Sequence, residues 1–200
     1  MSDTKPGGPR KRDASQPFGI WYRFRGAAFL PPMIFMFVFT RWEVEREVLI
    51  WPTGLLLFGL GEALRLWAQV HLRYRLAARE NLTRTGPYRY VRNPIYVGNT
   101  LILLSLCVMS ELVWLAPAML IWCAVVYSLV VRHEEKRLMA KYGAPYAEFL
   151  EAVPRWLPRL PRHSASVTPR ARGYLRPAVR AELHNLLLLV PFVLKELWMG

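Results

Sequence analysis

An apolar stretch runs from residue 94 to residue 131, and its only charged residue is Glu111. One helix crosses a hydrocarbon core of about 30 Å with about 20 residues, so this stretch is too long for a single crossing. The polar pair Ser110-Glu111 divides it into two helices of about 17 and 20 residues, and each can cross the core. Because the break is so short, the two helices form a hairpin. Their other ends then lie close together on the same side of the membrane.

Two further apolar runs precede this hairpin. Residues 48–70 have full spanning length and contain Glu62 and Arg65, which stand three positions apart and can pair on one helix face. Residues 26–40 are shorter, and two adjacent prolines interrupt them, which predicts a kinked or tilted first span. The sequence therefore predicts an all-α integral membrane protein with four transmembrane helices.

The composition agrees with a membrane protein. Of the 200 residues, 54% are hydrophobic, and the formal net charge is +13. In a membrane protein such an excess of positive charge sits on the cytoplasmic face beside anionic headgroups. The basic residues alternate with the spans, so nucleic-acid binding is not expected. Cys107 and Cys123 lie inside apolar runs, so they are expected to be buried hydrophobic side chains, with no disulfide framework and no metal site.

The distribution of lysine and arginine predicts the orientation of the spans. The tail (1–25), the loop 71–93 and the residues after 131 are basic. The turns 41–47 and 110–111, by contrast, together carry two arginines and four glutamates. Both termini are therefore expected in the cytoplasm.

Three parts of the chain are expected. Residues 1–25 are a basic cytoplasmic tail, residues 26–162 are the transmembrane domain, and residues 163–200 are a linker followed by an amphipathic or half-buried helix. A fifth transmembrane helix within residues 176–199 is the alternative, because the run LLLLVPFVL is apolar but short for a span.

The sequence RYVRNPIYVG (89–98) stands where the hairpin enters the membrane. Asn93 is a natural helix cap, and Pro94 suits the first turn of a helix. The tyrosines of this segment fit the aromatic belt of a membrane interface. Taken alone, the segment is therefore explained as well by a capped helix with an interfacial anchor as by a binding site.

Glu134 and Glu135 follow directly on the second helix of the hairpin. Adjacent carboxylates are unusual at a cytoplasmic membrane exit, where basic residues are preferred. They can pair with Arg132, Lys136 or Arg137. They can also face a cationic ligand or accept hydrogen bonds from its hydroxyl or amino groups. Because the hairpin brings its two cytoplasmic ends together, the tyrosine and asparagine cluster and the glutamate pair are expected to converge on one pocket.

Two segments in this order, GPYRYVRNPIYVGN (86–99) and EEKRLMAKYGAPYAEFLEAVPRWLP (134–158), resemble the isoprenylcysteine carboxyl methyltransferase family, which is related to the phospholipid N-methyltransferases. The resemblance covers roughly residues 60–162, about half of the chain. It implies a small helical membrane domain that binds S-adenosylmethionine on the cytoplasmic side through its C-terminal segment. Residues 26–162 are therefore expected to form a methyltransferase domain.

By position, the resemblance also implies contacts to the cofactor. Glu134 would hold a hydroxyl or amino group, with Glu135 in support, and Gly98 would allow close approach of the helix backbone. Tyr142 and Tyr146 would help the following segment to fold over the site. The implied cofactor-binding residues are Glu80, Asn81, Leu82, Thr83, Tyr88, Asn93, Pro94, Ile95, Tyr96, Gly98, Glu134, Glu135 and Tyr146.

Two positions depart from the family pattern. Asn93 stands where the family has His, and an amide can exchange hydrogen bonds but cannot titrate near neutral pH. Val130 stands where the eukaryotic enzymes have an arginine for the substrate carboxylate, and Arg132 is offset from that position along the helix. No general base is evident beyond His133. His133 and Arg132 are therefore the catalytic candidates of a reaction that depends mainly on orientation.

The sequence thus predicts an S-adenosylmethionine-dependent methyltransferase whose substrate is an amphipathic molecule of the membrane, either a prenylcysteine-like carboxylate or a lipid headgroup. One alternative is an NADPH-dependent membrane sterol or enone reductase, which would bind phosphate through Arg155 or Arg159. The other is a non-enzymatic membrane scaffold or transporter in which Glu62 and Arg65 act as a relay. The acceptor, the methylated atom and the oligomeric state are left open.

Overall fold

The computed structural model of the protein describes residues 26–39, 47–77, 82–160 and 173–199. Every regular element within these residues is helical, which confirms the all-α class. The tail 1–25 and most of the turn 41–47 lie outside the described residues. In chain order the elements are η1 (Ala27–Phe29), α2 (Leu30–Val38), α3 (Glu47–Ala77), η2 (Gly86–Arg89), α4 (Pro94–Met109), η3 (Val113–Leu115), α5 (Ala116–Tyr142), α6 (Ala144–Ala152), α7 (Leu175–Glu182), η5 (Leu183–Leu188) and α8 (Val190–Met199).

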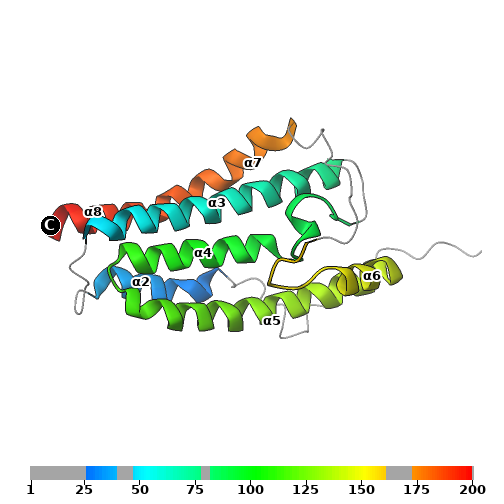
Figure 1. Ribbon diagram of the computed structural model, residues 1–200, viewed down its shortest axis with the longest axis horizontal. Coiled ribbons are helices and arrows are strands. Elements are labelled where there is room, and N and C mark those ends of the chain that lie inside the picture. Colours follow the sequence, from blue (N-terminus) through cyan, green and yellow to red (C-terminus); the bar gives the residue numbers. More distant parts are fainter. Residues whose placement is uncertain (1–25, 40–46, 78–81, 161–172, 200) are drawn as a thin grey trace, which may run out of the picture.

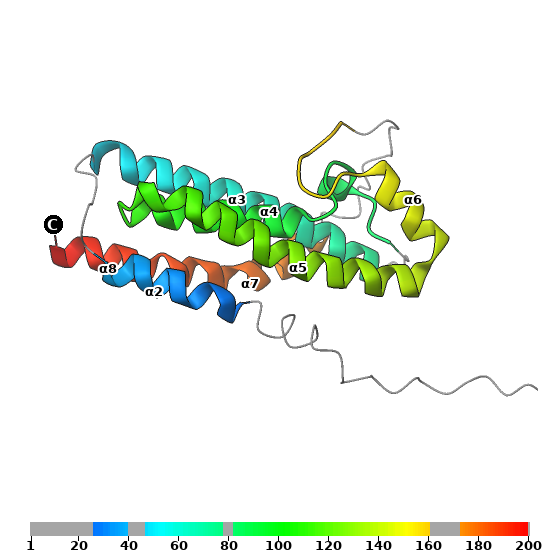
Figure 2. The ribbon, with the colours of Figure 1, turned by 90° about the horizontal axis from the view of Figure 1, so that it is seen from below.

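The long helices run side by side along one axis of the molecule, and α4 packs between α3 and α5 (Figure 1). Helices α2, α7 and α8 lie along one side of this layer of three (Figure 2). The core between the helices includes the fully buried side chains of Met36, Leu106 and Val131. The short helix α6 and the loop that contains η2 lie together at one end of the bundle (Figure 1).

The predicted hairpin between residues 94 and 131 is confirmed. Helix α4 ends at Met109, the chain turns through Ser110 and Glu111, and α5 returns alongside α4. A backbone hydrogen bond of 2.9 Å from Ser110 N to Leu106 O completes the last turn of α4. Helix α5 then continues without interruption past the apolar run to Tyr142, so Glu134 and Glu135 lie within the helix and not at its terminus.

Helices α3 and α4 approach each other closely at two glycines. A Cβ atom on Gly61 would lie 2.8 Å from the carbonyl oxygen of Gly98, and a Cβ atom on Gly98 would lie 2.8 Å from that of Gly61. Side chains at these positions would therefore force the two backbones apart. Small residues at such crossings are typical of helix packing in membranes.

The prolines at the start of the molecule do not bend a helix. The sequence predicts a kink at Pro31 and Pro32, but both lie in the first turn of α2, which begins at Leu30. The N–H groups of a first turn have no partners within the helix, so proline loses no hydrogen bond there. The pair therefore starts α2 and does not kink it, whereas the tilt that the sequence offers as the alternative stays a prediction.

Within the described residues, three helical stretches are long and apolar enough to cross a membrane: Leu49–Arg75, Val113–Tyr142 and Leu175–Lys195. Ala27–Val38 and Pro94–Met109 are apolar but shorter. These findings agree with an integral membrane protein, whereas the count of four spans and the cytoplasmic termini stay predictions. The C-terminal stretch, which the sequence predicts to be half-buried, has the length and composition of the alternative fifth span.

Candidate functional site

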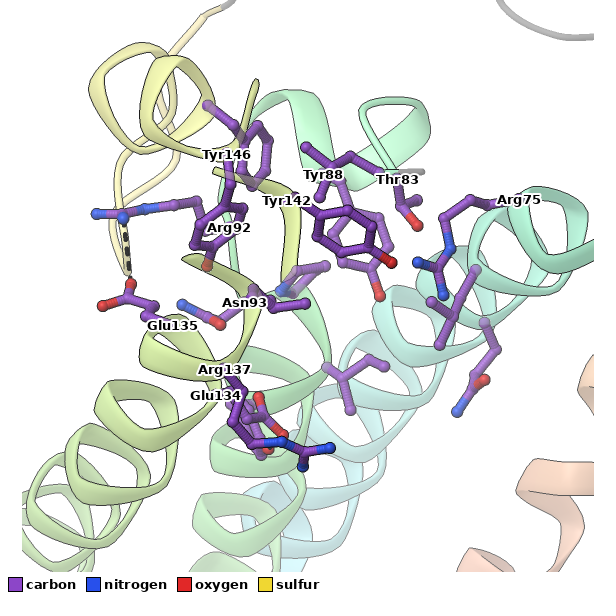
Figure 3. A pocket seen from close by; sticks show the side chains of 18 of the residues that line it. Arg75, Thr83, Tyr88, Arg92, Asn93, Glu134, Glu135, Arg137, Tyr142 and Tyr146 are labelled. Carbon is purple, nitrogen blue, oxygen red and sulfur yellow. Dashed lines mark hydrogen bonds and ion pairs between the residues drawn. The ribbon is translucent and has the colours of Figure 1, made fainter. Parts of the chain in front are cut away.

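A cavity of about 990 Å³ opens where α3, α4 and α5 end beside the η2 loop and α6. Figure 3 shows side chains from several of these elements around a common space, among them Thr83, Tyr88 and Tyr142, while Arg92 and Glu135 pair at its edge. Its walls come from α3 (Arg65, Gln69, Leu72, Arg75), from the η2 loop and the start of α4 (Leu82, Thr83, Tyr88, Arg92, Asn93, Pro94, Ile95, Tyr96, Asn99), from α5 (Glu134, Glu135, Arg137, Leu138, Lys141, Tyr142) and from α6 (Tyr146, Phe149).

The two ends of the hairpin meet in this cavity through Tyr96 and Glu134. Tyr96 lies in the first turn of α4, and its hydroxyl donates a hydrogen bond of 2.9 Å to Glu134 Oε1 on α5. The predicted convergence of the two motifs is therefore confirmed. The hydrogen bond occupies one oxygen of the carboxylate, so the Glu134 side chain retains acceptor capacity on the cavity wall.

Glu135 faces two arginines. Arg92 donates to Oε1 over 3.1 Å, and Arg155 donates from Nε to Oε1 over 3.1 Å and from Nη2 to Oε2 (Figure 3 shows the pair with Arg92). Both partners come from distant parts of the sequence, and neither is a neighbour of the glutamates in the helix. The adjacent carboxylates thus differ: Glu135 binds the surrounding chain, whereas Glu134 faces the cavity.

Residues 154–160, here called the strap, pass over the start of α4. The backbone N–H of Arg92 donates to Pro154 O over 2.9 Å, and that of Arg159 donates to Tyr90 O over 3.0 Å. Asn93 Nδ2 adds a hydrogen bond of 3.2 Å to Arg155 O. These three bonds, together with the Arg155–Glu135 ion pair, hold the strap beside the cavity.

Asn93 takes the N-cap position of α4, as predicted, but its side chain makes no capping hydrogen bond. Its amide donates to the strap instead, while its backbone carbonyl accepts from Tyr96 N over 3.1 Å. The prediction of a side-chain cap is therefore wrong. A histidine ring N–H is also a donor, so a histidine at this position could make the same hydrogen bond.

The η2 loop is fixed by a glycine and a histidine. Gly86 has φ +59°, and a Cβ atom there would lie 2.3 Å from the His71 ring. His71 Nδ1 in turn lies 2.9 Å from Thr85 Oγ1. This tight packing directs Tyr88 into the cavity wall, and burial raises the pKa of its phenol, so that it stays neutral.

The hydroxyl of Thr83 in the same loop is buried and has no hydrogen-bond partner within the described residues. A buried polar atom without a partner costs about 1–3 kcal/mol of stability. Because Thr83 lines the cavity, a polar ligand could supply the missing partner.

Tyr146 closes the cavity from α6. Its side chain is buried and packs against Phe149, with ring centroids 6.1 Å apart. Burial and the nearby Glu135 carboxylate raise the pKa of the phenol to about 12. Gly143 at φ +59° separates α5 from α6, and this turn directs Tyr146 back toward the site.

Most of the cofactor-binding residues implied by the resemblance lie together. Gly98 instead contacts Gly61 and Arg65 of α3, which gives this glycine a role in helix packing. Arg132 is exposed, and neither Arg132 nor His133 is among the described residues that line the cavity. Glu80 and Asn81 lie outside the described residues. The residues on the cavity wall are Leu82, Thr83, Tyr88, Asn93, Pro94, Ile95, Tyr96, Glu134, Glu135 and Tyr146.

Sequence reasoning missed the contribution of α3 to the site. Arg65, Gln69 and Leu72 follow one another at helical spacing and therefore share one face of α3, which forms a cavity wall. The spacing of these residues in the sequence could have predicted that α3 forms a wall of the cavity. The predicted Glu62–Arg65 pair is present, with 4.0 Å between Glu62 Oε1 and Arg65 Nε, but Arg65 also lines the cavity.

The cavity wall carries more positive than negative charge. Of the described residues that line it, five are basic and two are acidic. Glu135 is compensated by Arg92 and Arg155, whereas Glu134 accepts from the Tyr96 hydroxyl on the cavity wall. The basic residues are Arg65, Arg75, Arg92, Arg137 and Lys141.

The fold and the site define a helical membrane protein with a polar, aromatic-lined cavity at one end of the bundle. Residues 50–145 match the model of the phospholipid methyltransferase family. This match confirms the resemblance to the membrane methyltransferases that the motifs predict.

Two curated relatives are metal-resistance proteins. The chain is 30% identical over 126 residues to the cobalt-zinc-cadmium resistance protein CzcN of Cupriavidus metallidurans, which covers 62% of this chain and 57% of that protein. It is 30% identical over 96 residues to the nickel-cobalt-cadmium resistance protein NccN of Alcaligenes xylosoxydans xylosoxydans, which covers 48% of this chain and 44% of that protein. The chain thus spans about half the length of the curated relatives it matches. No solved structure matches the chain.

Proposed function

We propose that the protein is an S-adenosylmethionine-dependent methyltransferase whose acceptor is an amphipathic molecule of the membrane. The observation that carries this proposal is the Tyr96–Glu134 hydrogen bond, because it joins the two family motifs across a cavity. The match of residues 50–145 to the model of the phospholipid methyltransferase family supports the reaction class.

The residues of the cavity fit the proposed cofactor. A volume of about 990 Å³ is at the upper end of small-molecule sites and leaves room for an acceptor beside the cofactor. Glu134 can accept hydrogen bonds from ribose hydroxyls or from the ammonium group, and the unpartnered Thr83 hydroxyl can bind a further polar atom. Tyr88 and Tyr146 provide aromatic faces for the adenine ring.

The protein's own contribution to catalysis is position and exclusion of water. When bound, S-adenosylmethionine supplies a methyl group on a positively charged sulfur. Glu134 and the aromatic wall would orient the cofactor, and the strap and α6 would shield it from water. Arg92 and Arg155 neutralise Glu135, so the carboxylate directed at the ligand is Glu134 alone.

The acceptor is proposed to enter from the bilayer and the cofactor from the cytoplasm. Arg75, Arg137 and Lys141 on the wall favour a headgroup that carries a phosphate or a carboxylate. Both the prenylcysteine-like carboxylate and the lipid headgroup satisfy this condition. The strap carries Leu157 and Leu160, which are 81% and 83% exposed and suit the boundary between headgroups and acyl chains.

The reductase alternative would require Arg155 or Arg159 to bind the phosphate of NADPH. Arg155 is engaged with both oxygens of Glu135, which disfavours that use. Titration of NADPH into the purified protein separates the two functions, because saturable NADPH binding would support the reductase.

The proposal is tested by isothermal titration of S-adenosylhomocysteine into the full chain in detergent. Wild-type protein and Glu151→Gln are expected to bind, because Glu151 is exposed on α6, whereas Glu134→Gln should bind about a hundredfold more weakly. Absence of binding to the wild-type protein, with either S-adenosylhomocysteine or S-adenosylmethionine, would contradict the proposal.

A further inference from the structure

A polar network inside the bundle ends at the deep side of the cavity. Arg65 of α3 donates to Glu182 Oε2 of α7 from Nε over 2.9 Å and from Nη2 over 2.5 Å. Asn185 Nδ2 bridges Glu182 Oε2 and Glu62 Oε1, with 2.8 Å to each. Glu182 is only 5% exposed, so the ion pair is held away from solvent. Ionic groups are costly within a bundle of this kind, which makes a functional use of the network the first hypothesis to consider.

The network fixes the orientation of Asn99. Arg65 Nη1 donates to Asn99 Oδ1 on α4. A guanidinium has donors and no acceptor, so the carbonyl end of the amide must face Arg65. The NH2 end of Asn99 is then turned away from Arg65 as a donor, and no hydrogen bond from it is recorded within the described residues. Asn99 lines the cavity, as do Arg65 and Gln69.

This donor lies deeper along the bundle than the proposed cofactor contacts. Asn99 follows Tyr96 by three residues, which is about 4.5 Å along the axis of α4. The Nε–Nη2 edge of Arg65 faces α7, while its Nη1 end faces α4 at the cavity. An arginine has five N–H donors, so the three bonds to Glu182 and Asn99 leave two without a partner among the described residues.

We propose that Asn99 and Arg65 form an oxyanion subsite at the deep end of the cavity, and that Glu182 is the positioning residue that holds Arg65 in place. The ligand group is a phosphate oxyanion, carried by an amphipathic acceptor or by free phosphate. This inference rests on the proposed function, because it assigns the phosphate to the acceptor of that reaction. It adds Asn99, Arg65 and Glu182 to the residues that serve the site. Glu182 lies outside the segment that matches the family model, so the subsite depends on the C-terminal part of this chain.

The test measures binding of dodecyl phosphate to the full chain in dodecyl maltoside by isothermal titration. The key variant is Asn99→Asp, which keeps an acceptor for Arg65 and removes the amide donor. It is expected to weaken dodecyl phosphate binding about tenfold or more, while the affinity for S-adenosylhomocysteine changes less than about twofold. The matched control Glu151→Gln removes a carboxylate from the exposed face of α6 and should change neither affinity.

Glu182 is tested in the same assay by a double-mutant cycle. Glu182→Gln should weaken dodecyl phosphate binding in the wild-type background and add little in the Asn99→Asp background, because both changes act through Arg65. A purely structural role for Glu182 would instead weaken binding equally in both backgrounds.

Competition with inorganic phosphate identifies the source of the oxyanion. Failure of inorganic phosphate to displace dodecyl phosphate supports a membrane headgroup, and displacement at comparable concentration supports a soluble phosphate. The subsite is overturned if the wild-type protein does not bind dodecyl phosphate, or if Asn99→Asp binds it as tightly. Loss of S-adenosylhomocysteine binding alone would remove the proposed function and leave the subsite standing.

Discussion

Two regions of the molecule hold a buried or partly buried carboxylate, one on the cavity wall and one behind it, and they differ in how the chain assembles them. At the end of the hairpin, Glu134 meets Tyr96 from the adjacent helix. Deeper in the bundle, Glu182 meets Arg65, 117 residues earlier in the sequence. The hairpin geometry alone predicts the first meeting, because a short turn fixes which helix ends are neighbours. The second depends on how the C-terminal segment packs against α3, which no short connection dictates.

The comparison shows that similar carboxylates can serve different purposes. Glu134 has one recorded hydrogen-bond partner and faces the cavity, which suits a ligand-binding role. Glu182 accepts from an arginine and an asparagine through Oε2 and does not line the cavity, which suits a positioning role. Substitutions at the two sites should therefore separate cofactor affinity from stability.

The largest effect is expected on cofactor affinity. Glu134→Gln should weaken S-adenosylhomocysteine binding about a hundredfold, because it replaces a charged acceptor in a partly enclosed site. Glu182→Gln should change that affinity less than about threefold. Isothermal titration of both variants checks the contrast, and equal losses at both positions would erase the distinction between the two regions.

Removing the carboxylate of an ion pair should lower the free energy of unfolding more when the pair is more deeply buried, and three pairs test this ranking. Glu182→Ala leaves Arg65 without its main partner and is expected to cost about 3 kcal/mol, and Glu135→Ala about 2 kcal/mol. Glu148, which is 73% exposed and lies 3.9 Å from Arg84, serves as the control, and Glu148→Ala should cost less than about 0.5 kcal/mol. Reversible unfolding in mixed micelles measures the free energy of unfolding of each variant. If Glu148→Ala loses as much stability as Glu182→Ala, the ranking by burial is wrong.

The ionisation of Tyr146 on α6 should make the stability of the protein sensitive to alkaline pH. The pKa of Tyr146 is raised from 10 to about 12, so its contribution to stability is fully present below pH 10 and is lost as the pH rises toward 12. At pH 11 the loss is about 1 kcal/mol. Unfolding measured between pH 8 and 11 should be less pH-dependent in Tyr146→Phe than in wild type. An unchanged pH profile in this variant would place the alkaline sensitivity elsewhere.

The smallest effect is expected from restoring the family's histidine. Asn93 donates to the strap, and a histidine ring N–H can do the same. Asn93→His should therefore keep S-adenosylhomocysteine affinity within about threefold of wild type, whereas Asn93→Ala, which lacks a donor, should lose more. If Asn93→His and Asn93→Ala lose affinity equally, the donor role is incorrect.

Local rules predicted much of the fold and part of the site. The helices and the hairpin follow from apolar length, and the start of α4 follows from Asn93-Pro94. The partners of Glu135 could not be predicted, because the strap that carries Arg155 returns over α4 through backbone hydrogen bonds. Nor does the sequence reveal that the Asn93 amide bonds the strap and leaves its own helix uncapped. Local propensity thus identifies elements, while packing decides which polar groups meet.

The central claim is most directly tested by methyl transfer. The purified chain is incubated with methyl-labelled S-adenosylmethionine and a lipid extract of its host, and the label in the organic phase is measured and identified. Label should appear with wild-type protein and with Glu151→Gln, and it should fall to the level of the protein-free blank with Glu134→Gln. Wild-type protein that binds S-adenosylhomocysteine yet transfers no label to any lipid would contradict a lipid-directed methyltransferase.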